Sequence, residues 1–156
     1  MKRLALFRHA KTERDSDSGR DFDRRLTDRG RSNAKRIGQE IGEQGAIFDL
    51  ILSSPAARAA ETAEIAGLMP RFDQQIYNAS AGDLLGMVQG CDDSLTSVML
   101  IGHNPGFEQL ASRLTGQRFG MPTGSLVEMQ FSVDRWQDAG AGKARLIRFL
   151  QPKGLG

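Results

Sequence analysis

The sequence predicts an α/β fold, built as a three-layer α/β/α sandwich with a mostly parallel central sheet. Short apolar runs of strand length alternate along the chain with segments whose apolar residues repeat at helical spacing, as is typical of that architecture. Residues 97–101 form an apolar run without alternation, as expected for a central strand that helices cover on both faces. The length of 156 residues suits one domain, so we expect a single domain over residues 1–156.

The N-terminal part of the chain predicts one strand, one long loop and one helix. Residues 3–7 are an apolar run and predict a short buried strand. Residues 10–26 are polar and charged with little periodicity, and a loop of that length in a compact domain is more often functional than decorative. Thr27 is a suitable N-cap for the helix that follows, and Gly45 marks the end of that helix.

Two later helices are predicted from a polar cap followed by proline, because proline is favoured at the first helical position. Ser54-Pro55 predicts a helix to about Leu68, and Asn104-Pro105 predicts a second helix. The remaining expected elements are a short helix over residues 82–88 and strands over residues 48–52, 72–77, 97–101, 125–133 and 144–150.

Composition and charge limit the class of partner. The formal net charge of +2 is too small to argue for nucleic acid, and the arginines of residues 8–31 are interleaved with aspartates rather than with aromatic residues that could stack on bases. No apolar run approaches the ~20 residues that a membrane span needs, and we see no signal peptide, so we expect a cytoplasmic location and no membrane partner. The single cysteine, Cys91, excludes an internal disulfide and argues against a cysteine-based zinc site.

The only two histidines of the chain, His9 and His103, each follow a predicted strand. Imidazole has an ordinary pKa near neutrality, so it can act there as a base, an acid or a nucleophile. Open parallel sheets bind ligands at the carboxyl ends of their strands. Arg8 ends the first strand and Arg58 lies one turn into the helix after the second strand. We therefore expect these four residues to meet at one edge of the sheet.

These residue types suit the chemistry of a phosphoryl group. Arginine presents a planar, charged fork that matches phosphate oxygens, which makes Arg8 and Arg58 candidate phosphate ligands. A neutral His9 could attack phosphorus, and His103, protonated beside a bound dianion, could stabilise the transferred group. Lys11 is a weaker candidate for phosphate contact. Taken singly, Arg8 could be a surface residue and Arg58 an ordinary exposed helix arginine, so only the combination is specific.

Four stretches resemble motifs of the histidine phosphatase superfamily, whose fold is shared with phosphoglycerate mutases. Residues 6–12 resemble its Arg-His-Gly/Ala signature, and residues 24–30 resemble its Leu-Thr-x-x-Gly helix start. Residues 52–63 resemble its Ser-x-x-x-Arg-x-x-x-Thr-Ala element. Residues 101–105 resemble its second histidine motif, and the Asn-Pro pair and the small size are typical of the short, SixA-like phosphohistidine phosphatase branch.

The resemblance implies an enzyme, a metal-independent histidine phosphatase with no organic cofactor. It implies that His9 accepts the phosphoryl group, that Arg8 and Arg58 are phosphate ligands, and that His103 binds phosphate. Its partner would be a protein that carries phosphohistidine or a small phosphorylated substrate.

One position departs from the pattern of the family. Relatives often carry an acidic residue after the third strand as general acid, and Gln74 stands where that acid is expected. Asp73 is one residue away, and a shift by one position along a strand reverses the side-chain direction. Without the acid, a phosphoramidate such as phosphohistidine is favoured over a phosphomonoester, because its nitrogen leaving group can already be protonated.

Three alternatives stay open on the sequence. A small-molecule phosphomonoesterase or mutase of the same superfamily would use the same residues. A non-catalytic phosphate-binding module would need Arg8 and Arg58 but no nucleophile. A metal site built on the two histidines is weakly supported, because no carboxylate stands at paired ligand spacing from either one.

Overall fold

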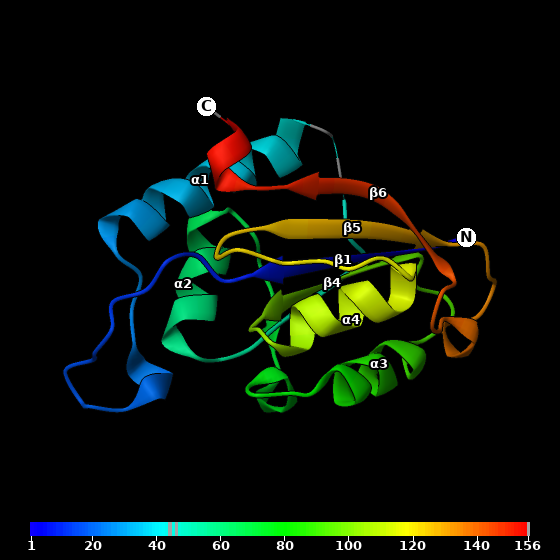
Figure 1. Cartoon of the computed structure of the whole chain (residues 1–156), viewed down its shortest axis with the longest axis horizontal. Helices are drawn as coiled ribbons and strands as arrows, with labels where there is room; N and C mark the ends of the chain where they lie inside the picture. Colours follow the sequence, from blue (N-terminus) through cyan, green and yellow to red (C-terminus); the bar gives the residue numbers. More distant parts are fainter. Residues whose placement is uncertain (44, 46, 156) are drawn as a thin grey trace.

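The computed structural model describes residues 1–43, 45 and 47–155 of the chain. Within these ranges, six strands form one sheet in the order β3-β2-β4-β1-β5-β6 (Figure 1). The strands are β1 (Lys2–Arg8), β2 (Leu50–Ser53), β3 (Arg71–Phe72), β4 (Ser97–Gly102), β5 (Leu126–Phe131) and β6 (Ala144–Leu150). Strands β1 to β4 pair in parallel, and β5 and β6 pair antiparallel, which confirms the mostly parallel sheet.

Helices cover both faces of the sheet. They are α1 (Asp28–Glu43), α2 (Ala57–Ile65), α3 (Ala81–Gln89) and α4 (Gly106–Thr115). Alternate residues of β1 point to opposite faces, so that Leu4 and Leu6 pack in one apolar cluster with α3 and α4, whereas Ala5 and Phe7 pack in another with α1 and α2. The two clusters on either side of the sheet confirm the three-layer α/β/α sandwich (Figure 1). No helix of the described part is long and apolar enough to cross a bilayer.

Strand β4 lies between β2 and β1, and every one of its residues is buried. This confirms the central strand expected over residues 97–101. Strands β1 and β4 are parallel neighbours, with Arg8 opposite Gly102 in the register. Both strands therefore end at the same edge of the sheet, and the residues that follow them are brought close together.

The strand predicted over residues 72–77 is wrong. Only Arg71–Phe72 forms a strand there, and a 3-10 helix, Gln74–Ile76, follows it. The carboxylate of Asp73 accepts a hydrogen bond from the backbone N–H of Gln75 at 2.9 Å. A side-chain bond of this kind offers the backbone an alternative to strand pairing, so the chain turns at this point. The remaining strands agree with the predicted ranges to within two residues at each end.

The two proline-containing helix starts lie where the sequence predicts them, but the helices begin later. Helix α2 begins two residues after Pro55, and α4 begins one residue after Pro105. The hydroxyl oxygen of Ser54 accepts a hydrogen bond from the backbone N–H of Ala56 at 3.2 Å. Ser54 therefore caps a turn ahead of α2 rather than the first turn of the helix itself.

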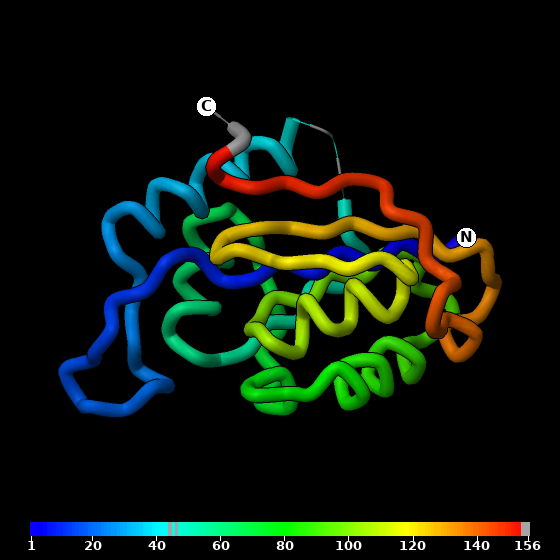
Figure 2. Tube along the Cα trace, in the orientation of Figure 1, coloured from blue at the N-terminus to red at the C-terminus, as the bar shows by residue number. Residues whose placement is uncertain are grey.

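The charged segment over residues 10–26 leaves β1 at its carboxyl end and returns to α1 (Figure 2). It contains a short 3-10 helix, Asp21–Asp23, and a single antiparallel bridge between Thr12 and Leu26. The guanidinium of Arg24 donates hydrogen bonds to the carbonyl oxygen of Glu13 at 2.9 Å and to Oγ1 of Thr12 at 2.7 Å. These bonds tie the outgoing and returning halves of the segment to each other.

Candidate active site

His9 and His103 directly follow β1 and β4, and the pairing of these strands sets the two histidines side by side. The backbone N–H of His9 donates a hydrogen bond to the carbonyl oxygen of Gly102 at 3.0 Å. The centroids of the two imidazole rings are 5.3 Å apart. The structure thus brings together two histidines that lie far apart in the sequence.

A cavity of about 640 Å³ opens at this edge of the sheet. The five residues that sequence analysis singles out all line it, namely Arg8, His9, Lys11, Arg58 and His103. Its other lining residues are Thr12, Asp21, Arg24, Asn78, Asn104 and Thr123. Among the described lining residues there are four lysines or arginines and one carboxylate, so the cavity has an excess of positive charge, as an anion site needs.

The imidazole of His9 is buried and held in one orientation. Its Nδ1 lies 2.8 Å from the carbonyl oxygen of Ala10. A carbonyl oxygen can only accept, so this bond assigns the hydrogen to Nδ1 and leaves the lone pair of Nε2 free to react. The pKa of His9 is lowered to about 3, mainly by burial and in addition by His103, Arg58 and Arg8, while the bond to Ala10 opposes this shift. His9 is therefore neutral at physiological pH, as a nucleophile must be.

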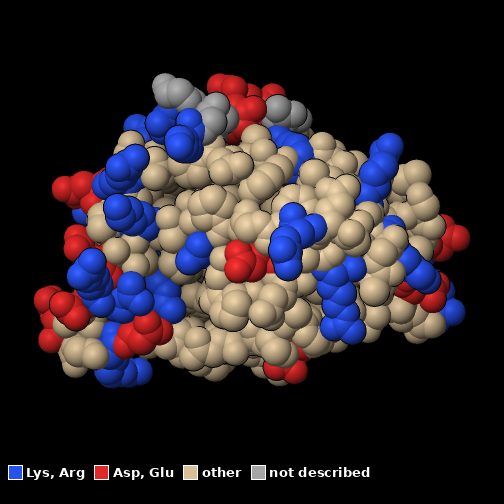
Figure 3. All heavy atoms as spheres, viewed as in Figure 1, with Lys and Arg blue, Asp and Glu red and all other residues tan. Residues whose placement is uncertain are grey.

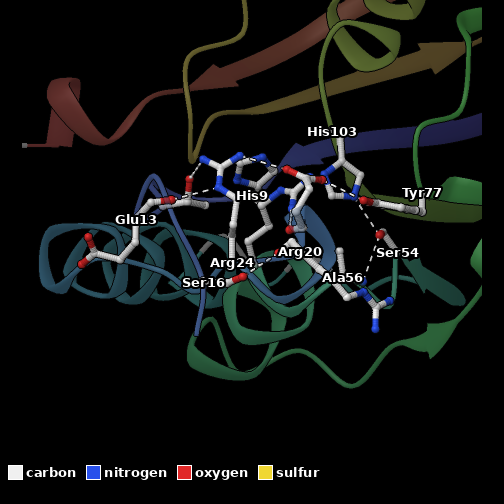
Figure 4. Close-up of polar contacts among 12 residues, drawn as sticks. His9, Glu13, Ser16, Arg20, Arg24, Ser54, Ala56, Tyr77 and His103 are labelled. Carbon is white, nitrogen blue, oxygen red and sulfur yellow. Dashed lines mark hydrogen bonds and ion pairs between the residues drawn. The ribbon is translucent and has the colours of Figure 1, made fainter. Parts of the chain in front are cut away.

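The ring of His103 is also buried, and a hydroxyl group holds it in place. Its Nε2 lies 2.7 Å from Oγ of Ser54, and Figure 4 shows the two side chains pointing toward each other. Its Nδ1 is buried and has no hydrogen-bond partner among the described residues. Burial, together with the charges of Arg58 and Arg8, lowers the pKa of His103 to about 4, and the carboxylate of Asp21 opposes this shift. A dianion in the cavity would act in the same direction as Asp21 and favour the protonated form.

The two arginines that line the cavity are each anchored by a backbone carbonyl. Arg8 donates from Nη1 to the carbonyl oxygen of Met121 at 2.7 Å, while its buried Nε has no partner among the described residues. Arg58 donates from Nη1 to the carbonyl oxygen of Asp21 at 2.8 Å. Burial lowers the pKa of Arg8, but arginine stays charged in proteins, so both groups remain able to bind an anion.

Asp21 from the charged segment is the acidic member of the site. Its carboxylate lies 3.0 Å from Nη2 of Arg58 and 3.0 Å from Nη1 of Arg24, and it accepts a hydrogen bond from the hydroxyl of Tyr77 at 2.7 Å. The bond from Tyr77, together with Arg24 and Arg58, lowers the pKa of Asp21 to about 2, and burial opposes this shift. Asp21 is therefore ionised, and it raises the pKa of the Tyr77 hydroxyl in turn. Figure 4 shows Tyr77, His103 and Ser54 close to one another.

Sequence analysis missed three residues of this site, namely Asp21, Tyr77 and Ser54. The unusual length of the polar loop was a signal for Asp21, but many aspartates of residues 15–28 are equivalent in the sequence. The sequence predicts Ser54 as a helix cap. Its contact with His103 joins the end of β2 to the end of β4, and a local pattern does not record such a contact. Tyr77 lies at the end of the range predicted as a strand, of which only Phe72 belongs to β3.

Gln74 stands at the position expected for a general acid, and Asp73 precedes it. Gln74 is exposed, and the carboxylate of Asp73 is occupied by the backbone N–H of Gln75. Neither residue lines the cavity beside the histidines. Asp73 is thus held in a turn of the chain, and its carboxylate is not among the groups that line the histidine cavity. Among the described residues, no three His, Cys, Asp or Glu side chains are grouped so that they could hold a metal ion.

Comparison with known proteins identifies the family of this chain. The model of the histidine phosphatase superfamily (branch 1) matches residues 4–97, which is more than half of the chain. The chain belongs to the histidine phosphatase superfamily. Members of this superfamily are phosphatases or mutases, so the arginine and histidine cavity belongs to a class of proteins that handle phosphoryl groups.

Several other proteins resemble this chain along most of its length. A candidate phosphohistidine phosphatase SixA from Agrobacterium tumefaciens is 31% identical, with a TM-score of 0.83 over 97% of this chain and 98% of that chain. The protein histidine phosphatase SixA complexed with tungstate has a TM-score of 0.84 over 99% of each chain, at 19% identity. An uncharacterized chloroplastic protein from Arabidopsis thaliana is 32% identical over 153 residues, covering 88% of this chain and 70% of that protein. The phosphoglycerate mutase-like fold expected from the motifs is confirmed.

Proposed function

We propose that this histidine phosphatase hydrolyses phosphohistidine in proteins through a phosphoryl group carried on His9, without a metal ion or an organic cofactor. The observation that carries the proposal is the state of His9. Its ring is buried and neutral, with Nδ1 bonded to the carbonyl oxygen of Ala10 at 2.8 Å, so Nε2 is the free nucleophilic atom. Arg8 and Arg58 line the same cavity and supply positive charge where the phosphoryl oxygens would lie, and His103 would add to it once a bound dianion favours its protonated form.

The proposed reaction has two displacement steps at phosphorus. In the first step, Nε2 of His9 attacks phosphorus and the bond between phosphorus and the substrate nitrogen breaks. The electron pair of that bond returns to the substrate imidazole, which leaves as a neutral ring because its other nitrogen already carries a proton. In the second step, water attacks phosphohistidine 9, and inorganic phosphate and neutral His9 are formed. Arg8 and Arg58 stabilise the charge on the transferred oxygens in both steps.

The charge state of the cavity supports a nitrogen leaving group. Asp21 is the one carboxylate among the described lining residues, and its pKa of about 2 leaves it without a proton to donate at neutral pH. A serine or sugar alkoxide leaves poorly without a proton donor, and a general acid typically contributes about 100-fold or more. A substrate imidazole can leave already protonated, so its departure needs no acid from the protein.

The test compares three phosphorylated substrates that differ in their need for an acid. Initial rates of phosphate release are measured on a phosphohistidine peptide, on p-nitrophenyl phosphate and on a phosphoserine peptide of the same sequence, in the presence and absence of a metal chelator. We expect kcat/KM to fall in that order, with phosphohistidine at least about 100-fold above phosphoserine and no effect of the chelator. A His9→Ala variant should release no phosphate from any of them, whereas Lys35→Gln, an exposed change on α1, should match the unaltered protein.

Three results would contradict the proposal. Faster hydrolysis of the phosphoserine peptide than of the phosphohistidine peptide would favour a phosphomonoesterase, and phosphoryl transfer to an added acceptor in place of water would favour a mutase. Tight binding of phosphate with no turnover of any substrate would favour a non-catalytic binding module. The cytoplasmic location and the single domain expected from the sequence stay predictions.

A further inference from the structure

A second cavity lies next to the candidate active site. Its volume is about 730 Å³, and it shares the lining residues Lys11 and Thr123 with the cavity that holds the histidines. Arg29 and Arg36 from α1 and Lys153 from the C-terminal segment supply its other cationic side chains. Figure 3 shows lysines and arginines gathered on the side of the molecule formed by α1 and the segment after β1.

Three of the four cationic side chains of this cavity differ from the other basic residues nearby. Arg24, Arg25 and Arg31 each form ion pairs with aspartate or glutamate. Lys11, Arg29 and Lys153 form no ion pair with any residue that the structure describes. No acidic side chain is among the described residues that line the cavity. The positive charge of Lys11, Arg29 and Lys153 is therefore available to an anionic partner.

The fold fixes this cavity relative to the histidine site. Gly124, which follows the shared residue Thr123, donates its backbone N–H to the carbonyl oxygen of His9 at 2.8 Å. Gly124 has φ +77°, a conformation that favours glycine, and Pro152 packs so closely that an added Cβ would lie 3.0 Å from its ring. The C-terminal segment that carries Lys153 is thus held beside the backbone of His9.

We propose that this second cavity is a subsite for acidic side chains that flank the phosphohistidine of a protein substrate. The inference rests on the proposed function and specifies its substrate class further. Lys11, Arg29, Arg36 and Lys153 come from three separate segments, so their charges are spread around an open cavity of about 730 Å³. Several carboxylates along a polypeptide match such a distribution better than one compact anion does. Because Lys11 lines both cavities, a substrate would pass from one to the other without leaving the positive surface.

The test measures binding by fluorescence anisotropy with two labelled peptides. Both carry a stable phosphonate analogue of phosphohistidine; one has several glutamates beside it, and the other has glutamines in the same places. We expect the unaltered protein to prefer the glutamate peptide. Arg29→Gln and Lys153→Gln should each weaken binding of the glutamate peptide by about twofold to fivefold and reduce this preference, and added salt should do the same.

Lys35→Gln is the matched control, because it removes one exposed charge from the same helix outside the cavity lining. It should keep the full preference for the glutamate peptide. Equal affinity of the unaltered protein for both peptides would overturn the proposal. An equal loss of affinity for the glutamate peptide in all three variants would also overturn it, because the preference would then depend only on the net charge of the protein. Competition by a small bisphosphate that depends on Arg29, with no preference for glutamate, would assign the cavity to a small anion instead.

A second pair of peptides, with plain histidine in place of the analogue, separates this inference from the proposed function. If the enzyme does not hydrolyse phosphohistidine, phosphate release fails for peptides of either flanking sequence. The preference of the unaltered protein for the glutamate peptide, and its reduction in Arg29→Gln, would still be measurable with the unphosphorylated pair. If the subsite is wrong, phosphohistidine is hydrolysed equally well with glutamate and glutamine flanks.

Discussion

Oδ2 of Asp21 lies 3.0 Å from Nη2 of Arg58, so one of the two guanidiniums proposed to bind phosphate already faces a carboxylate. The hydroxyl of Tyr77 donates to the same oxygen at 2.7 Å and helps to hold it there. A phosphoryl dianion that enters the cavity must therefore compete with Asp21 for Arg58. At the same time, Asp21 balances part of the positive charge that lowers the pKa of His103.

Replacing Asp21 with asparagine should strengthen inhibition by inorganic phosphate. The change removes a negative charge that competes for Arg58 and repels the incoming anion. The side chain of Asp21 is 49% exposed, so solvent screens this effect, and we expect the inhibition constant for phosphate to fall by up to about fivefold. Asp17→Asn, an exposed change in the same segment, should leave the constant as it is. Weaker inhibition by phosphate in the Asp21 variant would mean that Asp21 mainly positions Arg58.

The two buried histidines should make folding stability depend on pH in the acid range. The pKa of His9 is about 3 and that of His103 about 4, and both lie below the ordinary histidine value, mainly because of burial. As the pH falls below about 6.5, the unfolded chain takes up protons before the folded protein does. Stability is therefore fully present above that pH and is lost progressively as the pH falls toward about 3.

Urea unfolding at a series of pH values checks this expectation. Each histidine contributes a slope of up to about 1.4 kcal/mol per pH unit within its window. His103→Gln should show a shallower slope between about pH 6 and pH 4 than the unaltered protein. A free energy of unfolding that stays constant over this range in both proteins would show that the imidazoles titrate normally.

Ser54 should position His103, because its hydroxyl lies 2.7 Å from the ring nitrogen Nε2. Ser54→Ala leaves that buried nitrogen without its partner, which should lower the free energy of unfolding by about 1–3 kcal/mol. It should also lower kcat for phosphohistidine peptide and move the imidazole NMR signals of His103. Ser53→Ala is a matched control, since the buried Ser53 hydroxyl donates to the carbonyl oxygen of Ser54 and not to the imidazole. If both variants have the same kcat and the same His103 signals, Ser54 has only a structural role.

The contact between α1 and α2 should depend on Gly38. A Cβ at this position would collide with the backbone of Ala66, which cannot move aside without displacing the end of α2. We expect Gly38→Ala to lower the free energy of unfolding by about 1–3 kcal/mol. Gly42, on the same helix, has nothing within 4 Å of an added Cβ, so Gly42→Ala should raise stability by about 0.5–1 kcal/mol. Denaturant unfolding of both variants measures these two changes in the free energy of unfolding. If the two substitutions change it equally, α1 and α2 can move apart at little cost.

The position of the histidines and arginines could be predicted because it depends on the sheet. Residues 97–101 are apolar throughout, which indicates a central strand, and a parallel neighbour places His9 at the same edge as His103. Arg58 follows from its distance into the helix after β2. Predicting these positions requires only the direction of the strands and the number of residues per helical turn. Local sequence patterns indicate where the strands and helices lie.

The rest of the site depends on contacts that the local sequence does not record. Asp21 reaches Arg58 because the charged segment folds back on itself through bonds of Arg24 to Thr12 and Glu13. Tyr77 reaches Asp21 because Asp73 turns the chain after a strand of only two residues. In each case a hydrogen bond between side chain and backbone decides the path of the chain.

The most direct test of the account is to trap the phosphorylated protein. The enzyme is mixed briefly with radiolabelled phosphohistidine peptide and quenched, the acid and alkali stability of the protein-bound label is measured, and the labelled residue is located by mass spectrometry. The account predicts an acid-labile, alkali-stable label on His9 that is absent from His9→Ala. A label on another residue, or steady turnover by His9→Ala, would contradict it.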